Sequence, residues 1–592
     1  MFTIILIFLV LGMASSGIGQ YFLAPRQTQW TSVCFLVAAT LLAVVQIFIF
    51  EPSVTVLARW LESGSFSADW ALMTDKLSVG ITAFSLVLGT ILAFASLRDV
   101  ETHGPKLTAL ICAMCMGLLF LVASENLAQL FLGAALILGV RYLLLGLDCR
   151  SSSTMRAAQK SIVIQAIGLI PLALGLGAAF QLSDSLNFAE VLDPNLLTLV
   201  AEQQFRFLSI NMNAMELVGC LIVLGALGLS GVFPFQNWAQ NQKAPPSHSL
   251  IVVNGLSLGV GVIVLVRLTP LWSGSSWALG MLVLFGAITA LFAAIQSLLE
   301  KDILRPATQF SLALIALVFV ALGIGGASVG ILFLAGLFAV ISLFLLEGVR
   351  NGAEPKADLM QIGGLRDKLP LHFGLFLSAG LMLFGFGLPI ASGSLGNIGA
   401  AVWLLILSIL GVSWTRIVSL IFFGETKLKK KHLEAITDGA WRDWAPIAAS
   451  SALGFFVLIL TLTNTLPANA TFWISAVPLL LGIGIGSYFL LKRPQQTEIL
   501  VEKADAIAAT LAEQRDRLFD KLHGFLASLG EQLGKIADWA EGKFVERPMA
   551  VILAKFSADP DVLINRKRIY SAALLGSLIL IGLAWAFIRG AS

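Results

Sequence analysis

The chain has 592 residues, of which 57% are hydrophobic and 12% are charged. Soluble domains usually carry about 25% charged residues, so this composition excludes a soluble globular protein. The formal net charge of +3 also gives no support to a polybasic, nucleic-acid-binding protein.

Apolar stretches long enough to cross a bilayer recur along the whole chain. A hydrocarbon core requires about 20 apolar residues per helix, and lipid offers no hydrogen-bond partners to a non-helical backbone. The sequence therefore predicts an all-α membrane protein of about sixteen transmembrane helices, over residues 2–24, 30–50, 77–97, 107–124, 126–147, 160–181, 215–235, 248–268, 276–298, 306–325, 328–349, 370–392, 398–423, 445–465, 471–492 and 569–589. The first stretch lacks a basic leader region, so we interpret it as a membrane helix.

The basic residues are distributed unevenly between the two sides of this topology. Before residue 496, the odd-numbered connections hold eighteen Lys and Arg, whereas the even-numbered connections and the C-terminal tail hold five. Because cytoplasmic loops are enriched in Lys and Arg, the odd connections are predicted to be cytoplasmic in an inner, cytoplasmic membrane. Both termini are then expected on the non-cytoplasmic side.

A long amphipathic segment separates the last two predicted spans. Within residues 496–560, apolar residues such as Leu511, Leu518, Leu522 and Phe525 recur at three- and four-residue steps among charged residues, which is typical of an amphipathic helix. Some 50 helical residues would extend about 75 Å, so we expect a lateral helix along the cytoplasmic membrane surface. The alternative is a generic interfacial helix or a soluble coiled coil.

Several motifs carry a resemblance to a known family. They are Ser124–Gly133 followed by Tyr142–Leu144, Phe233–Trp238 followed by Ala244–Ser247 and Arg267–Leu268, Glu300–Arg305, Gln361–Pro370 and, more weakly, Phe422–Glu425. In order and spacing they resemble the antiporter-like subunits of complex I, particularly subunit L. Relatives of that family occur in multisubunit cation/proton antiporters, membrane-bound hydrogenases and inorganic-carbon-uptake systems.

The resemblance implies an antiporter-like bundle with broken seventh and twelfth helices. It also implies partners, because the lateral helix of subunit L clasps neighbouring membrane subunits of a multisubunit complex. A peripheral cytoplasmic subunit is a further candidate partner. We expect six segments: residues 1–106 with spans 1–3, 107–268 and 269–425 as two antiporter-like repeats, 426–495 with spans 14 and 15, 496–560 as the lateral helix and 561–592 as a C-terminal anchor.

The sequence departs from this family at the ionisable positions of the proton relay. The expected acid of helix 5, lysine of helix 7, histidine of helix 8, and two histidines and lysine of helix 11 fall on Ala135, Leu229, Val253, Leu332, Gly336 and Val340. These side chains cannot exchange protons. Because a mid-membrane charge costs at least about 2.5–3.5 kcal/mol to insert, its loss should be tolerated once transport is not required.

Ten ionisable residues remain as candidates for an ion path or for structural charges: Glu125, Arg141, Glu216, His248, Arg267, Lys301, Asp302, Glu347, Arg350 and Arg416. Arg141 lies about two turns inside its span and is near enough to the surface to snorkel. Glu347 and Arg350 are three residues apart on one helix face and are placed to pair. For these charges we favour structural roles over a rebuilt ion route, and for His248 an ordinary surface position over a cap or gating role.

No catalytic constellation is evident in the sequence, and we expect neither a cofactor nor a metal site. The sequence has no nucleotide-binding loop and no cysteine or histidine cluster with metal-ligand spacing. Cys112-x-x-Cys115 lies in an apolar run without a second ligand pair, so a buried structural role is predicted.

Three hypotheses for function follow. The leading one is a subunit-L-like membrane subunit of an energy-converting or inorganic-carbon-transport complex that has lost the usual proton relay and serves assembly. The second is an active proton or sodium translocator, of the NADH-quinone oxidoreductase type, with a rearranged path. The third, a redox subunit in its own right, would require a bound chromophore.

Overall fold

The computed structural model describes residues 1–19, 22–63, 66–97, 104–147, 152–195, 197, 204–207, 210–235, 247–325, 329–352, 359–387, 397–424, 441–465 and 480–487. All of them belong to one compact unit, residues 1–494; residues 495–592 form a second unit. The predicted lateral helix and final span lie outside the described residues, as does most of the fifteenth span.

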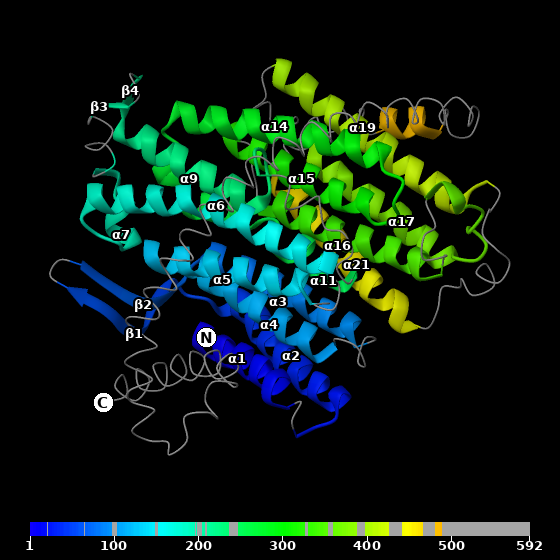
Figure 1. The fold of residues 1–592 in the computed structure, drawn as a ribbon, viewed down its shortest axis with the longest axis horizontal. Helices are drawn as coiled ribbons and strands as arrows, with labels where there is room; N and C mark the ends of the chain where they lie inside the picture. Colours follow the sequence, from blue (N-terminus) through cyan, green and yellow to red (C-terminus); the bar gives the residue numbers. More distant parts are fainter. Residues whose placement is uncertain are drawn as a thin grey trace. The chain divides into compact units, whose positions relative to one another are not determined.

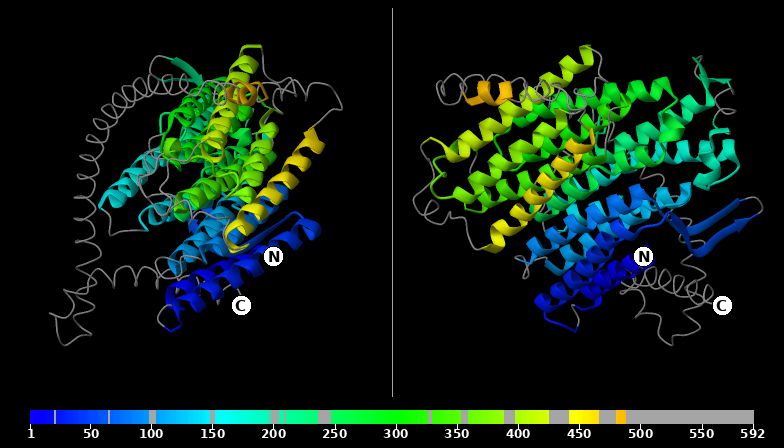
Figure 2. Two further views of the ribbon diagram at one scale, coloured as in Figure 1. Left: turned by 90° about the vertical axis from the view of Figure 1, so that its right-hand side faces the viewer. Right: turned by 180° about the vertical axis from the view of Figure 1, so that it is seen from behind.

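The described unit consists mainly of apolar helices packed side by side (Figures 1 and 2). They are α1 (Phe2–Gly19), α2 (Pro25–Ile49), α3 (Lys76–Ser96), α4 (Gly104–Val122), α5 (Leu127–Leu145), α6 (Ser152–Ser183), α7 (Phe188–Val191), α9 (Ala214–Ser230), α11 (Ser247–Val252), α12 (Val260–Arg267), α13 (Thr269–Trp272), α14 (Ser276–Leu299), α15 (Arg305–Gly323), α16 (Val329–Gly352), α17 (Pro370–Met382), α19 (Asn397–Phe422) and α21 (Trp441–Thr465).

Twelve helical segments among the described residues are long and apolar enough to cross a membrane, and α1 and α9 contribute two shorter apolar helices. These fourteen coincide with the first fourteen predicted spans. The prediction of a helical, multi-pass membrane protein is therefore confirmed. The total of sixteen stays a prediction, because the last two spans fall wholly or mostly outside the described residues.

Several helices begin at a side chain that caps their free backbone N–H groups. Asp75, Asn126, Asn213 and Ser275 each accept a hydrogen bond from a backbone N–H in the first turn of α3, α5, α9 and α14, respectively. Such caps satisfy donors that lipid cannot satisfy. They explain why these four helices start where they do.

Two small β-hairpins were not predicted. Strands β1 (Ser53–Ser63) and β2 (Phe66–Thr74) pair antiparallel, with Ser53 opposite Thr74, and β3 (Gln204–Phe207) pairs with β4 (Ile210–Asn213). Both hairpins lie at the same end of the bundle, at the left in Figure 1, which we call the hairpin end. The Met73 N–H donates to the Ala123 carbonyl at 2.7 Å, so β2 is fixed to the chain that joins α4 and α5.

The breaks expected in the seventh and twelfth spans are present. Helix α9 ends at Ser230, and its C-cap, Gly231, has a φ of 68°, the left-handed conformation that favours glycine. The Phe233 N–H beyond it donates to the Thr289 hydroxyl of α14 at 2.8 Å. Helix α17 ends at Met382 and continues as a 3₁₀ turn, Leu383–Gly387.

The eighth span is not the regular helix that the sequence predicted. A π-helical turn, Val253–Ser257, separates α11 from α12. Such turns insert an extra residue into the helix and are frequent at functional sites. The turn begins at Val253, the position where the family resemblance expects a histidine. It changes the direction in which the following side chains leave the helix.

Helices α6 and α9 approach each other closely through glycine. A Cβ atom added to Gly168 of α6 would lie 2.7 Å from the Cα atom of Gly228 in α9. Backbones of membrane helices approach this closely where small residues face each other, and van der Waals packing then holds them together. The approach keeps the broken helix α9 against α6.

We therefore expect Gly168→Val to destabilise the full-length chain by about 1–3 kcal/mol, the usual cost of overpacking. The matched control is Gly177→Val on the same helix, where an added Cβ meets nothing within 4 Å. Thermal unfolding in detergent measures both variants. Equal melting temperatures for the two would contradict the close approach.

Candidate functional site

Among the described residues, Arg141 is the charged residue with the least exposed surface, 0%. Its Nε donates to the Ser257 hydroxyl at 2.8 Å and its Nη1 to Gln165 Oε1 at 2.9 Å. Nη1 also donates to the Leu229 carbonyl at 2.7 Å, and Nη2 donates to the Ser257 carbonyl. The side chain therefore does not snorkel, contrary to the sequence-based expectation, because its acceptors lie inside the bundle.

These acceptors lie where helices are interrupted. Leu229 is the second-last residue of α9, and Ser257 is the last residue of the π-helical turn. The last carbonyls of a helix lack intrahelical partners and carry the negative end of its dipole, which a cation stabilises. Arg141 of α5 thus satisfies backbone acceptors at two helix interruptions.

Arg267 forms a second buried contact of this kind at the hairpin end. Its Nη1 lies 2.5 Å from Asp75 Oδ2, and its Nη2 donates to the carbonyl of Val122, the last residue of α4. Asp75 also accepts the Ser78 N–H at 2.8 Å and so caps α3. One arginine at the end of α12 therefore joins the ends of α3 and α4.

Opposing effects act on the pKa of the Asp75 carboxyl. Burial alone would raise its pKa, but the Arg267 guanidinium and the hydrogen bonds from Ser78 outweigh burial and hold the pKa below its ordinary value. The carboxylate therefore remains charged and binds both groups at neutral pH.

Arg416 of α19 forms the third contact. It is 3% exposed, and its Nη1 donates at 3.0 Å to the carbonyl of Glu300, which is the C-cap of α14. Nearby, the Ser297 hydroxyl of α14 donates to the Ser413 hydroxyl of α19 at 3.0 Å. The three buried arginines thus share one role, which is to donate to carbonyls at helix carboxyl ends.

The positions where the family resemblance expects relay groups are packed with aliphatic side chains. Leu229, Val253 and Val340 are each 0% exposed, and Leu332 is 7% exposed. Gly336 is buried and Ala135 is half-buried. The structure thus places all but one of these positions in the bundle interior.

Three of these positions, Leu332, Gly336 and Val340, form one face of α16 against the interrupted eighth span. A Cβ atom added to Gly259 would lie 2.6 Å from Leu332 Cδ1, and one added to Gly336 would lie 2.9 Å from the Gly255 carbonyl oxygen. A Cβ atom added to Gly255 would overlap Val340 Cγ2. Little space for water remains between these two elements.

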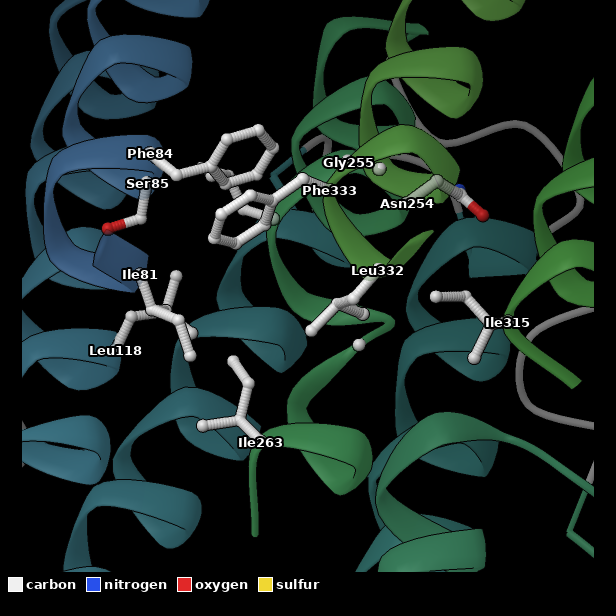
Figure 3. A pocket seen from close by; sticks show the side chains of 13 residues that line it. Ile81, Phe84, Ser85, Leu118, Asn254, Gly255, Ile263, Ile315, Leu332 and Phe333 are labelled. Atoms are coloured by element: carbon white, nitrogen blue, oxygen red, sulfur yellow. The ribbon is translucent and has the colours of Figure 1, made fainter. Parts of the chain in front are cut away.

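A cavity of about 30 Å³ lies beside this contact (Figure 3). Its lining is mainly aliphatic and aromatic, and Ile81, Ile263 and Leu332 turn their carbon ends into it. Two polar side chains reach it, but both donate within their own helix: Ser85 to the Thr82 carbonyl and Asn254 to the Leu250 carbonyl. A volume of this size suits about one water molecule, which is insufficient for a continuous water chain.

A group of titratable residues lies at the opposite end of α16 from the hairpins. His248 Nδ1 of α11 is 3.6 Å from Glu347 Oε1 of α16, and both residues are buried. His372 of α17 is 4% exposed, and its Nε2 would lie 2.7 Å from a Cβ atom added to Gly348. His248 is thus not the ordinary surface residue that we expected. Arg350, the expected partner of Glu347, is exposed.

The remaining candidates lie near helix ends. Glu216 accepts the Asn213 N–H at 3.2 Å and completes the cap of α9. Asp302 accepts the Leu304 N–H at 2.9 Å before α15, next to exposed Lys301. Burial, together with the neighbouring Asp69 charge, raises the pKa of the Glu125 carboxyl. None of these four is brought together with Arg141.

Sequence reasoning missed several of the bonding partners, among them Gln165, Ser257 and Asp75. A serine or glutamine in an apolar span gives one usable signal, because a buried polar side chain requires a partner. Among the described residues, no group of three or more His, Cys, Asp or Glu is placed to hold a metal ion.

We expect Asp75→Asn, which keeps a capping side chain but removes the charge, to melt below the wild-type chain at neutral pH. Because the pKa of Asp75 lies below its unfolded value of about 3.9, its stabilisation is present above about pH 4 and is lost as the pH falls through the folded pKa. The difference in melting temperature should therefore shrink in acid. Exposed Glu190→Gln is the control, and a pH-independent difference for Asp75→Asn would contradict this account.

Comparison with known proteins agrees with this architecture. Chain 5 of NADH-ubiquinone oxidoreductase from Chondrus crispus is 24% identical over 507 residues, which is 81% of this chain and 76% of that protein. Subunit L of NADH-quinone oxidoreductase from Rhodobacter capsulatus is 28% identical over 66% of this chain, but the match covers only 57% of that protein. Four further curated relatives, each a chain 5 of NADH-ubiquinone oxidoreductase, are matched over only 50% or 51% of their length.

Two solved structures share the fold. A chain of the membrane-bound sulfane sulfur reductase, an archaeal respiratory membrane complex, has a TM-score of 0.70 at 16% identity and covers 98% of this chain and 99% of its own. A chain of the Mrp complex from Dietzia has a TM-score of 0.64 at 15% identity, over 98% of this chain and 63% of its own. Residues 124–429, just over half of the chain, match the family model described as NADH:quinone oxidoreductase/Mrp antiporter, transmembrane, and the chain therefore belongs to this family of antiporter-type membrane proteins.

Proposed function

We propose that this chain is a subunit-L-like membrane subunit of a multisubunit energy-converting, ion-transport or inorganic-carbon-transport complex, that it serves structure and assembly, and that it has lost the usual proton relay. The names of its relatives support the first part, since two of them are subunit L or chain 5 of NADH-quinone and NADH-ubiquinone oxidoreductases. On this proposal, the chain has no catalytic site of its own.

One observation carries the loss of the relay. The face of α16 formed by Leu332, Gly336 and Val340 packs against Gly255 and Gly259 so closely that added side-chain atoms would overlap. A relay requires groups that bind and release protons, or water between them, and this contact supplies neither. The path that the family resemblance expects is therefore interrupted in the middle of the bilayer.

The buried arginines support the same proposal. Arginine does not release its proton in proteins, so Arg141, Arg267 and Arg416 do not act as relay groups. Each donates to a carbonyl at the end of a helical segment, where a positive charge stabilises the fold. Their charges serve the structure.

The alternative is an active proton or sodium translocator with a rearranged path. The contact between His248 and Glu347 favours it, because both side chains carry ionisable groups and both are buried. On this reading, protons would enter near the start of α11 and leave by a route that avoids the packed face of α16.

Ion flux distinguishes the two functions. The complex is purified through a tag on this chain, reconstituted into liposomes, and assayed with Arg141→Ala or Glu347→Gln in place of the wild type. We expect flux per assembled complex to be unchanged, because neither residue would carry the ion. A loss of about tenfold, which corresponds to about 1.4 kcal/mol in activation free energy, would contradict the proposal.

The control for this assay is Glu190→Gln, an exposed carboxyl on α7. Flux is normalised to the amount of complex that elutes intact, because Arg141→Ala leaves buried carbonyls without a donor and should lower stability. Reduced yield with unchanged specific flux is the result expected of a structural arginine.

The assembly role assigns a function to the predicted lateral helix, residues 496–560. On the proposal this helix lies on the cytoplasmic side of an inner membrane and contacts neighbouring membrane subunits through its apolar stripe. Leu518 and Leu522 lie on that stripe, whereas Glu513 and Asp520 fall on the opposite face of a helix with 3.6 residues per turn.

We therefore expect Leu518→Asp combined with Leu522→Asp to release the partner subunits. Glu513→Gln combined with Asp520→Asn is the matched control on the polar face. Proteins that co-purify with the tagged chain in mild detergent are quantified by mass spectrometry. Full retention of partners by the double aspartate variant would refute the clasping role, and the partners found with the wild type would identify the complex.

A further inference from the structure

A second, much larger cavity opens among α3, α12, α13, α14, α15 and α16, and nothing in the proposed function uses it. Its volume is about 560 Å³. Most of its wall consists of aliphatic side chains, among them Val262, Val266, Val318 and Leu322. We call Leu332, which also lines the cavity of about 30 Å³, the floor of this cavity.

The mouth of this cavity lies at the hairpin end. Arg267, the last residue of α12, binds Asp75 beside the β1–β2 hairpin, and the lining residues Thr269 and Ser273 follow directly. Both of these are exposed, whereas Val262 and Val318 deeper in the cavity are 2% and 1% exposed. The cavity is therefore an open pocket with exposed polar residues at its entrance and apolar side chains along its walls.

Water is a poor occupant of such an interior. Apolar cavities stay dry, and one of about 150 Å³ already takes up benzene. A volume of 560 Å³, part of which lies in the open entrance, still has room for a hydrocarbon longer than benzene. Around a chain with twelve apolar membrane-spanning segments among its described residues, the hydrocarbon at hand is the acyl chain of a phospholipid.

We propose that this cavity binds one acyl chain of a membrane phospholipid. The headgroup lies at the entrance beside Thr269 and Ser273, and the alkyl chain descends between α12 and α15 to Leu332. The floor is essential, because the family resemblance expects a histidine where this chain has Leu332. An imidazole at that depth would attract water, whereas the leucine completes an apolar site.

The site also lies next to the interrupted relay. Ile81, Ile263 and Leu332 line both this cavity and the cavity of about 30 Å³, so an alkyl chain here closes the approach from the hairpin end. Binding does not depend on the proposed loss of ion transport, because it rests on the lining of this cavity alone.

The experiment uses the full-length chain in phosphatidylcholine nanodiscs that contain a phosphatidylethanolamine with a diazirine midway along one acyl chain. After illumination, adducts are mapped by mass spectrometry. We expect adducts on the α12 segment Val262–Val266 and on the α15 segment Val318–Leu322. Val266→Trp, which fills the cavity from α12, should lower their yield about tenfold, equivalent to about 1.4 kcal/mol of binding free energy.

Val329→Trp fills the cavity from the opposite wall, α16, and provides a second test if the first variant does not fold. Leu284→Trp is the control, since Leu284 is 56% exposed on the outer face of α14. Its cavity adducts should equal those of the wild type. Melting temperatures verify that each variant is folded.

Adducts found only on outer positions such as Leu284 would overturn the proposal, as would cavity adducts of equal yield in both tryptophan variants. Oxidation of Val318 by hydroxyl radicals generated in water would overturn it too, because it would show a hydrated cavity. None of these outcomes bears on ion flux, so failure of the lipid site and failure of the proposed function are distinguishable.

Discussion

The bundle depends on one interaction above the others, the donation of hydrogen bonds from Arg141 to backbone carbonyls inside the membrane. A broken helix exposes carbonyls that lipid cannot satisfy, and this chain interrupts two neighbouring spans at the same depth. One guanidinium from α5 reaches the carbonyls of Leu229 and Ser257. Because the groups satisfy one another, the breaks and the buried charge are stable only together. Arg267 and Arg416 also donate to backbone carbonyls, those of Val122 and Glu300, at helix ends.

This interaction shows why the sequence predicted the fold better than the site. Fourteen spans follow from local hydropathy, and the break after α9 follows from the Phe233–Trp238 motif. The partners of Arg141 lie 24, 88 and 116 residues away in the sequence, and no local pattern joins them. Position alone therefore suggested that Arg141 would snorkel. The β1–β2 hairpin had a usable signal, since Val54, Thr55 and Val56 are strand-forming residues, but it is short and stands between two long apolar spans whose hydropathy dominates the pattern.

The positions of the buried charges also differ from those that the family resemblance implies. Where the family resemblance expects a lysine side chain, at Leu229, the chain presents a backbone carbonyl to an arginine from α5. A cation thus remains in the middle of the bundle, but on another helix and in a form that does not exchange protons. On the proposed function, this exchange converts a titratable site into a fixed structural one.

The aliphatic side chains of α16, Leu332 and Val340, also affect how much water enters the centre of the bundle. Charged groups inside a membrane protein recruit water, and a path lined by leucine and valine does not. Once Leu332 replaces an ionisable group, the floor of the large cavity changes from a place suited to water to one suited to hydrocarbon. The packed contact of Gly336 with Gly255 then separates that cavity from the titratable pair His248 and Glu347. On the proposed function and the proposed lipid site, this antiporter-type bundle loses its relay and gains an apolar ligand site through the same few substitutions, because both properties depend on the amount of water in the centre of the bundle.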